Sequence, residues 1–178
     1  MRLPPLPLAL AALTAGTATA TNTNTTYPDL GSFHITSLSA SAGRGSPGST
    51  KTTIAFQIQE AGNSVDSVVD ACSAQWDLNG IGWPHGRIFC NTTAWSWFFS
   101  RHESFGEFTL ELTHGYREPV AADGQRFFRE KYARHSFTRD RRAGADCHYA
   151  ASGFSQCSWT DLDIPVYNST LLGPIGPF

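Results

Sequence analysis

Apolar and polar side chains alternate along several short runs of this chain, and this alternation is the feature that most limits its fold. The segment Thr52–Gln59 is the clearest case. One of its faces carries Ile54, Phe56 and Ile58, and the other carries Ala and Gln side chains. Glu107–His114 repeats the pattern, with apolar residues at every second position. A period of two residues is typical of a β-strand with one buried face.

Similar runs fill most of the remaining chain. The other expected strands are Phe33–Leu38, Val65–Trp76, Arg87–Asn91, Trp95–Phe99, Phe127–Thr138, Ser155–Trp159 and Leu162–Tyr167. Turn signals such as Asn79-Gly80 and Asp123-Gly124 separate them. No stretch of the sequence carries a sustained helical repeat of apolar residues. The sequence therefore predicts an all-β fold, either an antiparallel β-barrel or a β-sandwich.

The first 20 residues have the parts of a secretory signal peptide. Arg2 gives a positive start, Leu6–Leu13 forms a short apolar core, and Ala18–Ala20 is a small-residue cleavage site. The alternative is an uncleaved anchor, but the apolar run is shorter than the about 20 residues that span a bilayer. The sequence therefore predicts a signal peptide at residues 1–20 and a secreted, extracellular protein.

One domain is expected behind this leader. Residues 21–32 are polar and predict a loose N-terminal arm, and residues 33–167 predict a single β domain. Residues 168–178 end in LLGPIGPF, whose prolines and glycines predict an irregular C-terminal tail. The net charge of -2 gives no basic field to attract nucleic acid or an anionic membrane, so neither is an expected partner.

Three N-x-Ser/Thr sequons follow the leader, and in a secreted chain each is a candidate glycosylation site. They begin at Asn24, Asn91 and Asn168. Asn24 and Asn168 lie in polar segments that would tolerate a glycan. Asn91 follows Cys90 directly, so it is accessible only if that strand end is exposed.

Four cysteines fall as two closely spaced pairs, Cys72 with Cys90 and Cys147 with Cys157. Four cysteines allow three connectivities, and the sequence alone does not choose among them. The short separations favour local pairing, with each disulfide closing one hairpin and stabilising the fold by about 3 kcal/mol. Neither pair has the C-x-x-C spacing of a zinc or redox motif, so the cysteines are interpreted as structural.

The cysteines also belong to a longer pattern. It runs through Phe33-x-Ile35, a Gly-rich loop, TIAFQIQ, Cys72-Ser73-Ala74, Trp83, Cys90, Trp97-x-Phe99, Leu110-x-Leu112 and two closely spaced cysteines before a final strand. In order and spacing, the chain from about Phe33 to Val166 resembles the Alt a 1-like (AA1-like) family of secreted fungal proteins, known as allergens and plant-interacting effectors.

This resemblance implies a compact antiparallel β-barrel or β-sandwich with the local disulfides Cys72–Cys90 and Cys147–Cys157. It also implies a protein without enzymatic activity that binds plant defence proteins or, in some members, small phenolic ligands. The founding allergen has a further N-terminal cysteine that links two subunits. The arm of this chain has none, so we expect a monomer or a non-covalent dimer.

Basic residues concentrate in the second half of the chain, more than the family resemblance implies. The candidate partner-binding cations are Arg129, Lys131, Arg134 and Arg139. Trp83 joins them because Gly-Trp-Pro is typical of a loop tip. The alternatives are a solvated strand face for the cations and a core position for Trp83. Arg141-Arg142 is a candidate dibasic processing site.

A secreted hydrolase such as a ribonuclease would need a base, an acid and a cationic clamp in one cleft. The candidate residues are His102, Glu103, His114 and Glu118, with Arg87 and Arg117 as possible clamps. Their spacing matches no ribonuclease signature, and neither H-E-x-x-H nor G-x-S-x-G occurs. We therefore expect no catalytic residues, metal or cofactor.

Three hypotheses follow. The preferred one is a secreted, non-catalytic effector or allergen-like protein that binds a host or partner protein outside the cell. The second is a small-ligand or carbohydrate binder that uses the mouth of the barrel. The third, from a different class, is the secreted hydrolase.

Overall fold

A single antiparallel sheet of nine strands wraps around a core in the computed structural model, which describes residues 30–43, 51–61, 68–77, 83–118 and 125–175. The elements are β1 (Ser32–Ala42), β2 (Lys51–Glu60), β3 (Asp70–Asp77), β4 (Ile88–Phe89), β5 (Trp95–Ser104), β6 (Glu107–Arg117), β7 (Arg126–Phe137), the 3-10 helix η1 (Arg141–Ala143), β8 (Asp146–Tyr149) and β9 (Ser155–Ile175). The prediction of an all-β fold is confirmed.

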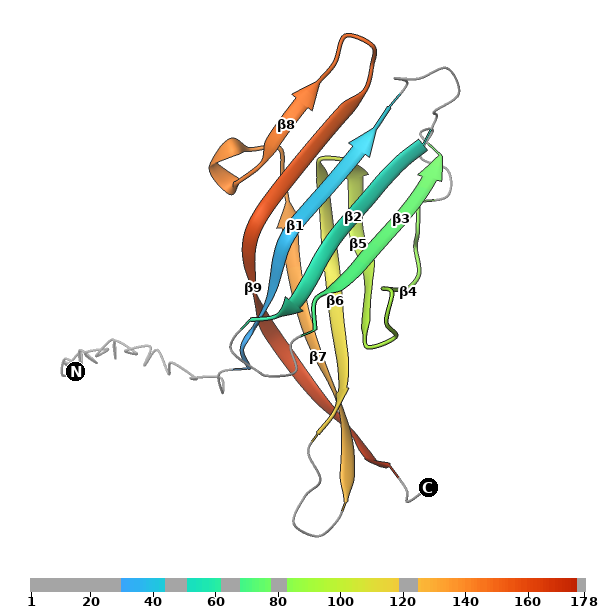
Figure 1. Cartoon of the computed structure of the whole chain (residues 1–178), viewed down its shortest axis with the longest axis vertical. Helices are drawn as coiled ribbons and strands as arrows, with labels where there is room; N and C mark the ends of the chain where they lie inside the picture. Colours follow the sequence, from blue (N-terminus) through green and yellow to red (C-terminus); the bar gives the residue numbers. More distant parts are fainter. Residues whose placement is uncertain (1–29, 44–50, 62–67, 78–82, 119–124, 176–178) are drawn as a thin grey trace, which may run out of the picture.

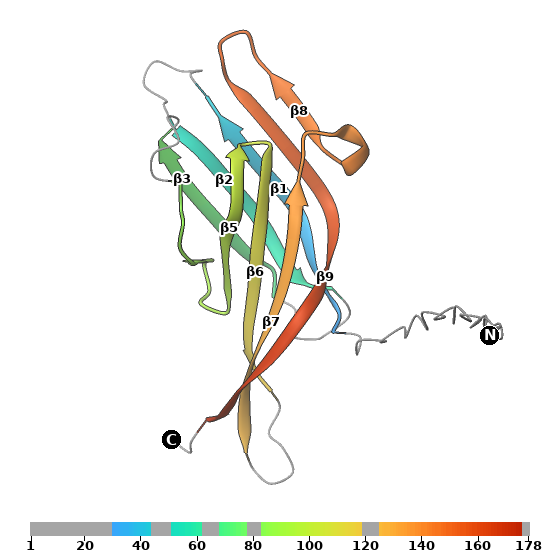
Figure 2. The same ribbon diagram turned by 180° about the vertical axis from the view of Figure 1, so that it is seen from behind.

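The strands run in the order β3-β2-β1-β9-β7-β6-β5-β4, and β8 pairs with β9 outside this path. Figure 1 shows β3, β2, β1 and the first half of β9 as a front layer, with β5, β6 and β7 behind. Figure 2 shows the rear layer from the other side. Because β9 passes from one layer to the other, the sheet curls into a nearly closed barrel.

Strand β9 corrects two predictions about the end of the chain. Its first half pairs with β1 as far as Pro165, and its second half pairs with β7 from Val166 to Ile175. The sequence predicted two strands with a break between residues 159 and 162, but β9 is continuous there. The predicted irregular tail over 168–178 is also wrong as far as residue 175, where the described residues end. From Val166 on, β9 pairs with β7 alone among the described strands, so this half is an edge strand, where proline is tolerated, and Pro174 lies near the strand end.

Several other boundaries differ from the sequence predictions. Ser32, assigned to the arm, begins β1, and the expected strand over 65–76 begins only at Asp70 in the described residues. At this start of β3 the Asp70 carboxylate accepts from the backbone N–H of Ala71. The sequence did not predict β8, a strand of only four residues. The signal peptide at 1–20, Asn24 and the arm up to residue 29 lie outside the described residues.

The core lies between the two layers, where the inward faces of the alternating strands meet. On β2 these are Ile54, Phe56 and Ile58, all buried. The largest fully buried side chains elsewhere are Trp97, Trp159, Phe33, Phe137, Ile35, Leu38, Leu110, Leu112 and Ile164. Phe56 meets Trp97 edge to face across the layers, with 5.4 Å between ring centroids. These large buried side chains form a packed core. Each contributes about 1.5–3 kcal/mol to the stability of the fold by leaving water.

Both predicted disulfides are present, but only one closes a hairpin. Cys147 and Cys157 lie directly opposite each other on β8 and β9. Cys72 on β3 joins Cys90, which follows β4. Since β3 and β4 are the two ends of the strand order, this second disulfide bridges the seam of the barrel. A backbone hydrogen bond from Asn91 to Ala71, 2.9 Å long, crosses the same seam.

Candidate functional site

The outer face of the rear layer carries arginine and tyrosine side chains that rest on carboxylates. We call this surface the Arg–Tyr face and define it by Arg87, Glu111, Glu130, Tyr132, Arg134 and Tyr167. Alternation along β7 explains its origin: Ala133 is fully buried, so Tyr132 and Arg134 on either side of it point outward. Glu111 lies directly opposite Arg134 on β6. The same alternation places Glu130 on this face, two residues before Tyr132.

Glu111 is the centre of this face. Its side chain is only 7% exposed, whereas that of Arg134 is 61% exposed. The guanidinium of Arg134 donates to Glu111 Oε1, and the Tyr167 hydroxyl donates to Glu111 Oε2 at 3.3 Å. The Arg134 guanidinium also lies 5.9 Å from the centroid of the Tyr167 ring. A nearly buried carboxylate thus holds an exposed cation and an exposed phenol in fixed positions.

A second carboxylate organises the neighbouring part of the face. Glu130 Oε2 accepts from the Tyr132 hydroxyl at 2.5 Å, and Glu130 Oε1 accepts from Arg87 at 3.4 Å. The hydrogen bond to Glu130, together with burial, raises the pKa of Tyr132. Burial and the charge of Glu111 raise the pKa of Tyr167. Both phenols therefore remain protonated donors at neutral pH.

The other predicted partner-binding cations do not extend this surface. Lys131 points between the layers, where Glu60 of β2 accepts from its ammonium at 3.1 Å. Arg129 donates to Glu118 and to Ser169. Each of these two charges is paired with a nearby carboxylate, so neither is free to attract a partner.

Arg139 lies apart from the others, after the end of β7. Its guanidinium donates to Ser104 at 2.6 Å and lies 5.3 Å from the ring centroid of Phe105. Of the four candidate cations, Arg134 is thus the one on the Arg–Tyr face. The dibasic Arg141-Arg142 forms part of the exposed helix η1.

A charged and aromatic cluster lies between the layers at the end of β2. His114 Nδ1 lies 2.9 Å from Glu60 Oε1, which also receives the Lys131 hydrogen bond. The His114 ring stacks on Trp95 with 4.1 Å between centroids. The hydrogen bond from His114 and the nearby Lys131 charge lower the pKa of Glu60, although burial opposes the shift. The cluster joins β2 to β6 and β7 and so ties the front layer to the rear layer.

Trp83 packs against the core. Its ring stacks on His102 with 5.3 Å between centroids and lies 6.0 Å from Phe99. It is half-buried, so the alternative of a packing role describes its position better than an exposed loop tip. Burial lowers the pKa of His102, and its Nε2 is buried without a hydrogen-bond partner in the described structure.

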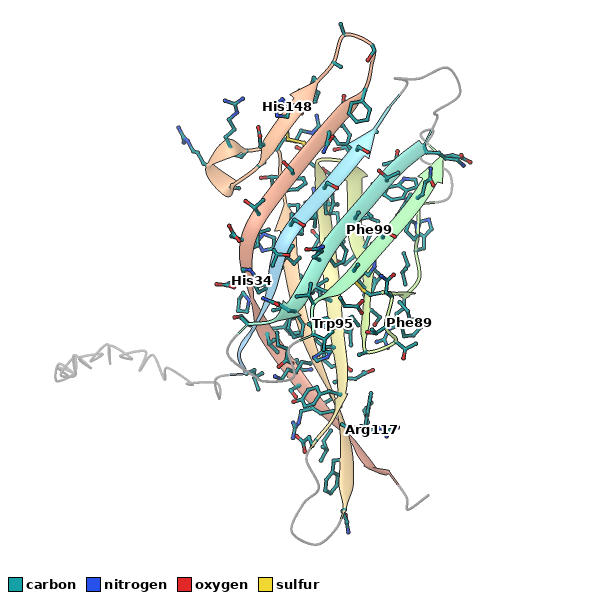
Figure 3. All side chains as sticks on the ribbon, in the orientation of Figure 1. His34, Phe89, Trp95, Phe99, Arg117 and His148 are labelled. Atoms are coloured by element: carbon teal, nitrogen blue, oxygen red, sulfur yellow. A yellow bond between two sulfur atoms is a disulfide. The ribbon has the colours of Figure 1, made fainter. Side chains whose placement is uncertain are left out.

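The candidate hydrolase residues do not come together. His102 contacts Phe99 whereas His114 contacts Trp95, and Figure 3 shows these two aromatic residues at different heights along β5. At about 3.3 Å per residue the two histidines lie roughly 20 Å apart along the strands. Glu103 pairs with Arg101 on the outer surface. Within the described ranges no group of three or more His, Cys, Asp or Glu residues could hold a metal ion.

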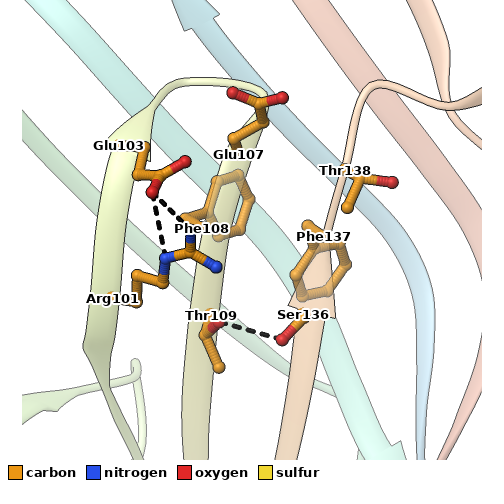
Figure 4. Close-up of a pocket in the computed structure, with 8 residues that line it drawn as sticks. All are labelled: Arg101, Glu103, Glu107, Phe108, Thr109, Ser136, Phe137 and Thr138. Carbon is orange, nitrogen blue, oxygen red and sulfur yellow. Dashed lines mark hydrogen bonds and ion pairs between the residues drawn. The ribbon is translucent and has the colours of Figure 1, made fainter.

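A small hollow lined by polar side chains and by Phe108 and Phe137 lies where β5 and β7 end and β6 begins (Figure 4). Its volume is about 190 Å³, below the 300–1,000 Å³ usual for small-molecule sites. Arg101 is held by Glu103, and Thr109 Oγ1 lies 2.9 Å from Ser136 Oγ. Polar groups of this hollow are therefore already engaged with one another.

The fold and these surfaces define a disulfide-stapled, antiparallel β-barrel with a filled interior and an ordered Arg–Tyr face. No protein-family model matches the chain, and comparisons with curated proteins and with solved structures give no match either. The resemblance to the Alt a 1-like family therefore stays a prediction. In the part of the chain that the structure describes, no helix is long and apolar enough to cross a membrane.

Proposed function

We propose that this is a secreted, non-catalytic binding protein, of the effector or allergen-like kind, whose Arg–Tyr face contacts a partner protein outside the cell. The observation that carries this proposal is the arrangement of Arg134 and Tyr167 over the buried Glu111. Arginine and tyrosine are enriched among residues that dominate binding energy at protein interfaces. Side chains fixed before binding lose less conformational entropy when the complex forms.

The chemistry of the face defines the partner. Arg134 presents a largely exposed guanidinium, because Glu111 beneath it is almost inaccessible. Tyr132 and Tyr167 add flat amphipathic rings with hydroxyl groups at their ends. A complementary surface would supply a carboxylate for Arg134 and apolar side chains for the rings. We therefore propose a partner protein with an acidic and apolar patch, and the family resemblance makes a plant defence protein the first candidate.

Secretion is part of the proposal. It is supported by the leader pattern in residues 1–20 and by two disulfides, Cys72–Cys90 and Cys147–Cys157, that account for every cysteine of the chain. Disulfides persist in oxidising compartments and are rare in the cytosol.

The small-ligand and hydrolase hypotheses have less structural support than the partner-binding hypothesis. The small-ligand hypothesis needs an apolar cavity, whereas large side chains such as Trp97 and Trp159 fill the interior. The hydrolase hypothesis needs His102 and His114 in one cleft, and they lie apart. Neither is retained as a second proposal.

The test is a capture experiment with matched variants. The mature protein and its Arg134→Ala and Arg139→Ala variants are immobilised and exposed to the extracellular fluid of a candidate host plant. We expect a protein that the wild type and Arg139→Ala retain and that Arg134→Ala loses. Equal retention by all three variants would contradict a role for the Arg–Tyr face. Turnover of RNA or glycan by the purified protein, with nothing retained, would overturn the binding function.

A further inference from the structure

A shallow hollow of about 360 Å³ lies on the outer face of the front layer, beside one of the sequons. Its lining consists mainly of short side chains from β1, β2 and β3, namely Ser37, Ser39, Ala55, Ala71 and Ser73, together with Gln57. Asn91, the first residue of the sequon Asn91-Thr92-Thr93, also lines the hollow and is exposed. The hollow exists because residues with short side chains occupy adjacent outward positions on three neighbouring strands.

The turn that carries Asn91 is fixed to the edge of β3. The preceding residue, Cys90, is bonded to Cys72, and the Asn91 N–H donates to the Ala71 carbonyl at 2.9 Å. The following residue, Thr92, donates from its hydroxyl to Asp70 Oδ2 at 2.6 Å and from its N–H to the same oxygen at 3.1 Å. A group attached to Asn91 would therefore project from a fixed point beside the hollow.

We propose that Asn91 carries an N-linked glycan whose first N-acetylglucosamine lies in this hollow. The inference rests on the proposed secretion, because the glycan donor and its transferase belong to the secretory pathway. In the transfer, the side-chain amide nitrogen of Asn91 bonds to the anomeric carbon of a lipid-pyrophosphate-linked oligosaccharide. The bond from that carbon to the pyrophosphate breaks, the amide loses one proton, and the lipid pyrophosphate leaves. Thr93 supplies the sequon hydroxyl and is exposed.

The lining suits a sugar ring. Ser37, Ser39 and Ser73 present hydroxyl groups, each of which can donate one hydrogen bond and accept others. The Ala55 and Ala71 methyl groups offer apolar contact to the acetamido methyl group and to the C–H faces of the ring. Short side chains leave room that long ones would fill. A lining that is part polar and part apolar matches the polar and apolar surfaces of a pyranose.

The described sequon at Asn168 differs in its surroundings. Asn168 lies within β9, opposite Tyr132, and its side-chain oxygen accepts from the N–H of Ser169 at 2.8 Å. Neither of the two hollows described above includes it. A glycan at Asn168 would project into solvent. Removing that sequon with Asn168→Gln is therefore the matched control for removing the Asn91 sequon with Asn91→Gln.

The first test measures occupancy and contact. The chain is expressed with its own leader in a eukaryotic secretory host, and the glycan is trimmed to one N-acetylglucosamine with an endoglycosidase. Mass spectrometry of the medium should find the sugar on Asn91. Nuclear Overhauser effects should join its acetamido methyl group to the Ala71 or Ala55 methyl groups. Secreted protein with an empty Asn91, or with sugar contacts only to the exposed Phe89 ring (Figure 3), would overturn the inference and leave secretion standing.

The second test measures coupling. We expect the single sugar on Asn91 to lower the unfolding equilibrium constant about five-fold, the effect of one net hydrogen bond. Ser73→Leu, which fills the hollow, should remove this effect. Gln75→Leu lies on the same face of β3 outside the hollow and should keep it. Equal effects in both backgrounds would overturn the docking. Protein found only inside the cells would contradict secretion itself, and a heterologous leader would then test the docking separately.

Discussion

At the scale of single residues, the clearest consequences come from two partly buried titratable groups that sit in opposite surroundings. Glu60 has hydrogen-bond partners in His114 and Lys131, which favour its charged form. His102 is surrounded by the rings of Trp76, Trp83 and Phe99, which disfavour its charged form. The two residues should therefore change the stability of the fold in different ranges of pH.

Glu60→Gln should destabilise the protein by about 1 kcal/mol at pH 7, the size of a hydrogen bond to charged groups at a partly exposed position. The pKa of Glu60 is lowered from 4.5, so its contribution is complete above pH 4.5 and is lost as pH falls through the lowered value. Urea unfolding at pH 7 and at pH 3 checks this. The same difference between variant and wild type at both pH values would contradict it.

His102→Phe should make the protein more resistant to mild acid. Burial lowers the pKa of His102 from 6.5, so the unfolded chain binds a proton that the folded chain resists. Stability of the wild type therefore falls as pH drops below 6.5, and the variant should lose part of this slope. Burial also lowers the pKa of His135, so His135 keeps the rest of the pH dependence in the variant. Thermal melts from pH 7 to pH 5 measure the slope, and the control is His148→Phe, an exposed position on β8 (Figure 3). Parallel curves for wild type and His102→Phe would refute it.

At the scale of strands, alternation predicted the elements that bury one face. Thr52–Gln59 and Glu107–His114 became the centres of β2 and β6. The predictions failed where a segment becomes a strand by hydrogen bonding to a neighbouring strand and has no alternating apolar face of its own. β8 is short and has no alternating apolar face, and the end of β9 carries Gly173 and Pro174 but is held by β7.

Cleavage at Arg141-Arg142 should leave a nicked protein that stays in one piece. The disulfide Cys147–Cys157 lies entirely within the C-terminal fragment, so no covalent bond would join the two fragments. β9 nevertheless pairs with β1 along one half and with β7 along the other. A specific protease site introduced at 141–142 tests this by size-exclusion chromatography. We expect one native peak that separates only in denaturant, and a fragment released in native buffer would disprove the account of β9.

Removing either disulfide should cost about 3 kcal/mol on the chain-entropy model, because the two loops differ little in length. The local consequences should differ. Cys72→Ser with Cys90→Ser opens the seam, so exchange of the Asn91 amide with solvent should accelerate strongly. Cys147→Ser with Cys157→Ser should leave that amide protected. Hydrogen exchange read by mass spectrometry distinguishes them, and equal protection of Asn91 in both variants would argue against a seam disulfide.

At the scale of the whole molecule, the barrel acts as a rigid support with function placed on its outside. The sequence predicted Arg134 as a candidate because basic residues concentrate in that part of the chain, and alternation along the same strand puts Tyr132 beside it. It missed Glu111 and Tyr167, which come from β6 and β9, since the order of strands is not readable from a single sequence. A signal was present in Glu111, a carboxylate at an outward position within the apolar run Glu107–His114.

The central claim is that the Arg–Tyr face binds a partner protein. Its most direct test is the dissociation constant of the captured partner, measured with wild type, Arg134→Ala, Tyr167→Ala and Arg139→Ala. We expect Arg134→Ala and Tyr167→Ala to weaken binding by roughly 30-fold each, the effect of losing a dominant interface residue. Arg139→Ala should bind like the wild type. Dissociation constants that do not change for Arg134→Ala and Tyr167→Ala would contradict the account.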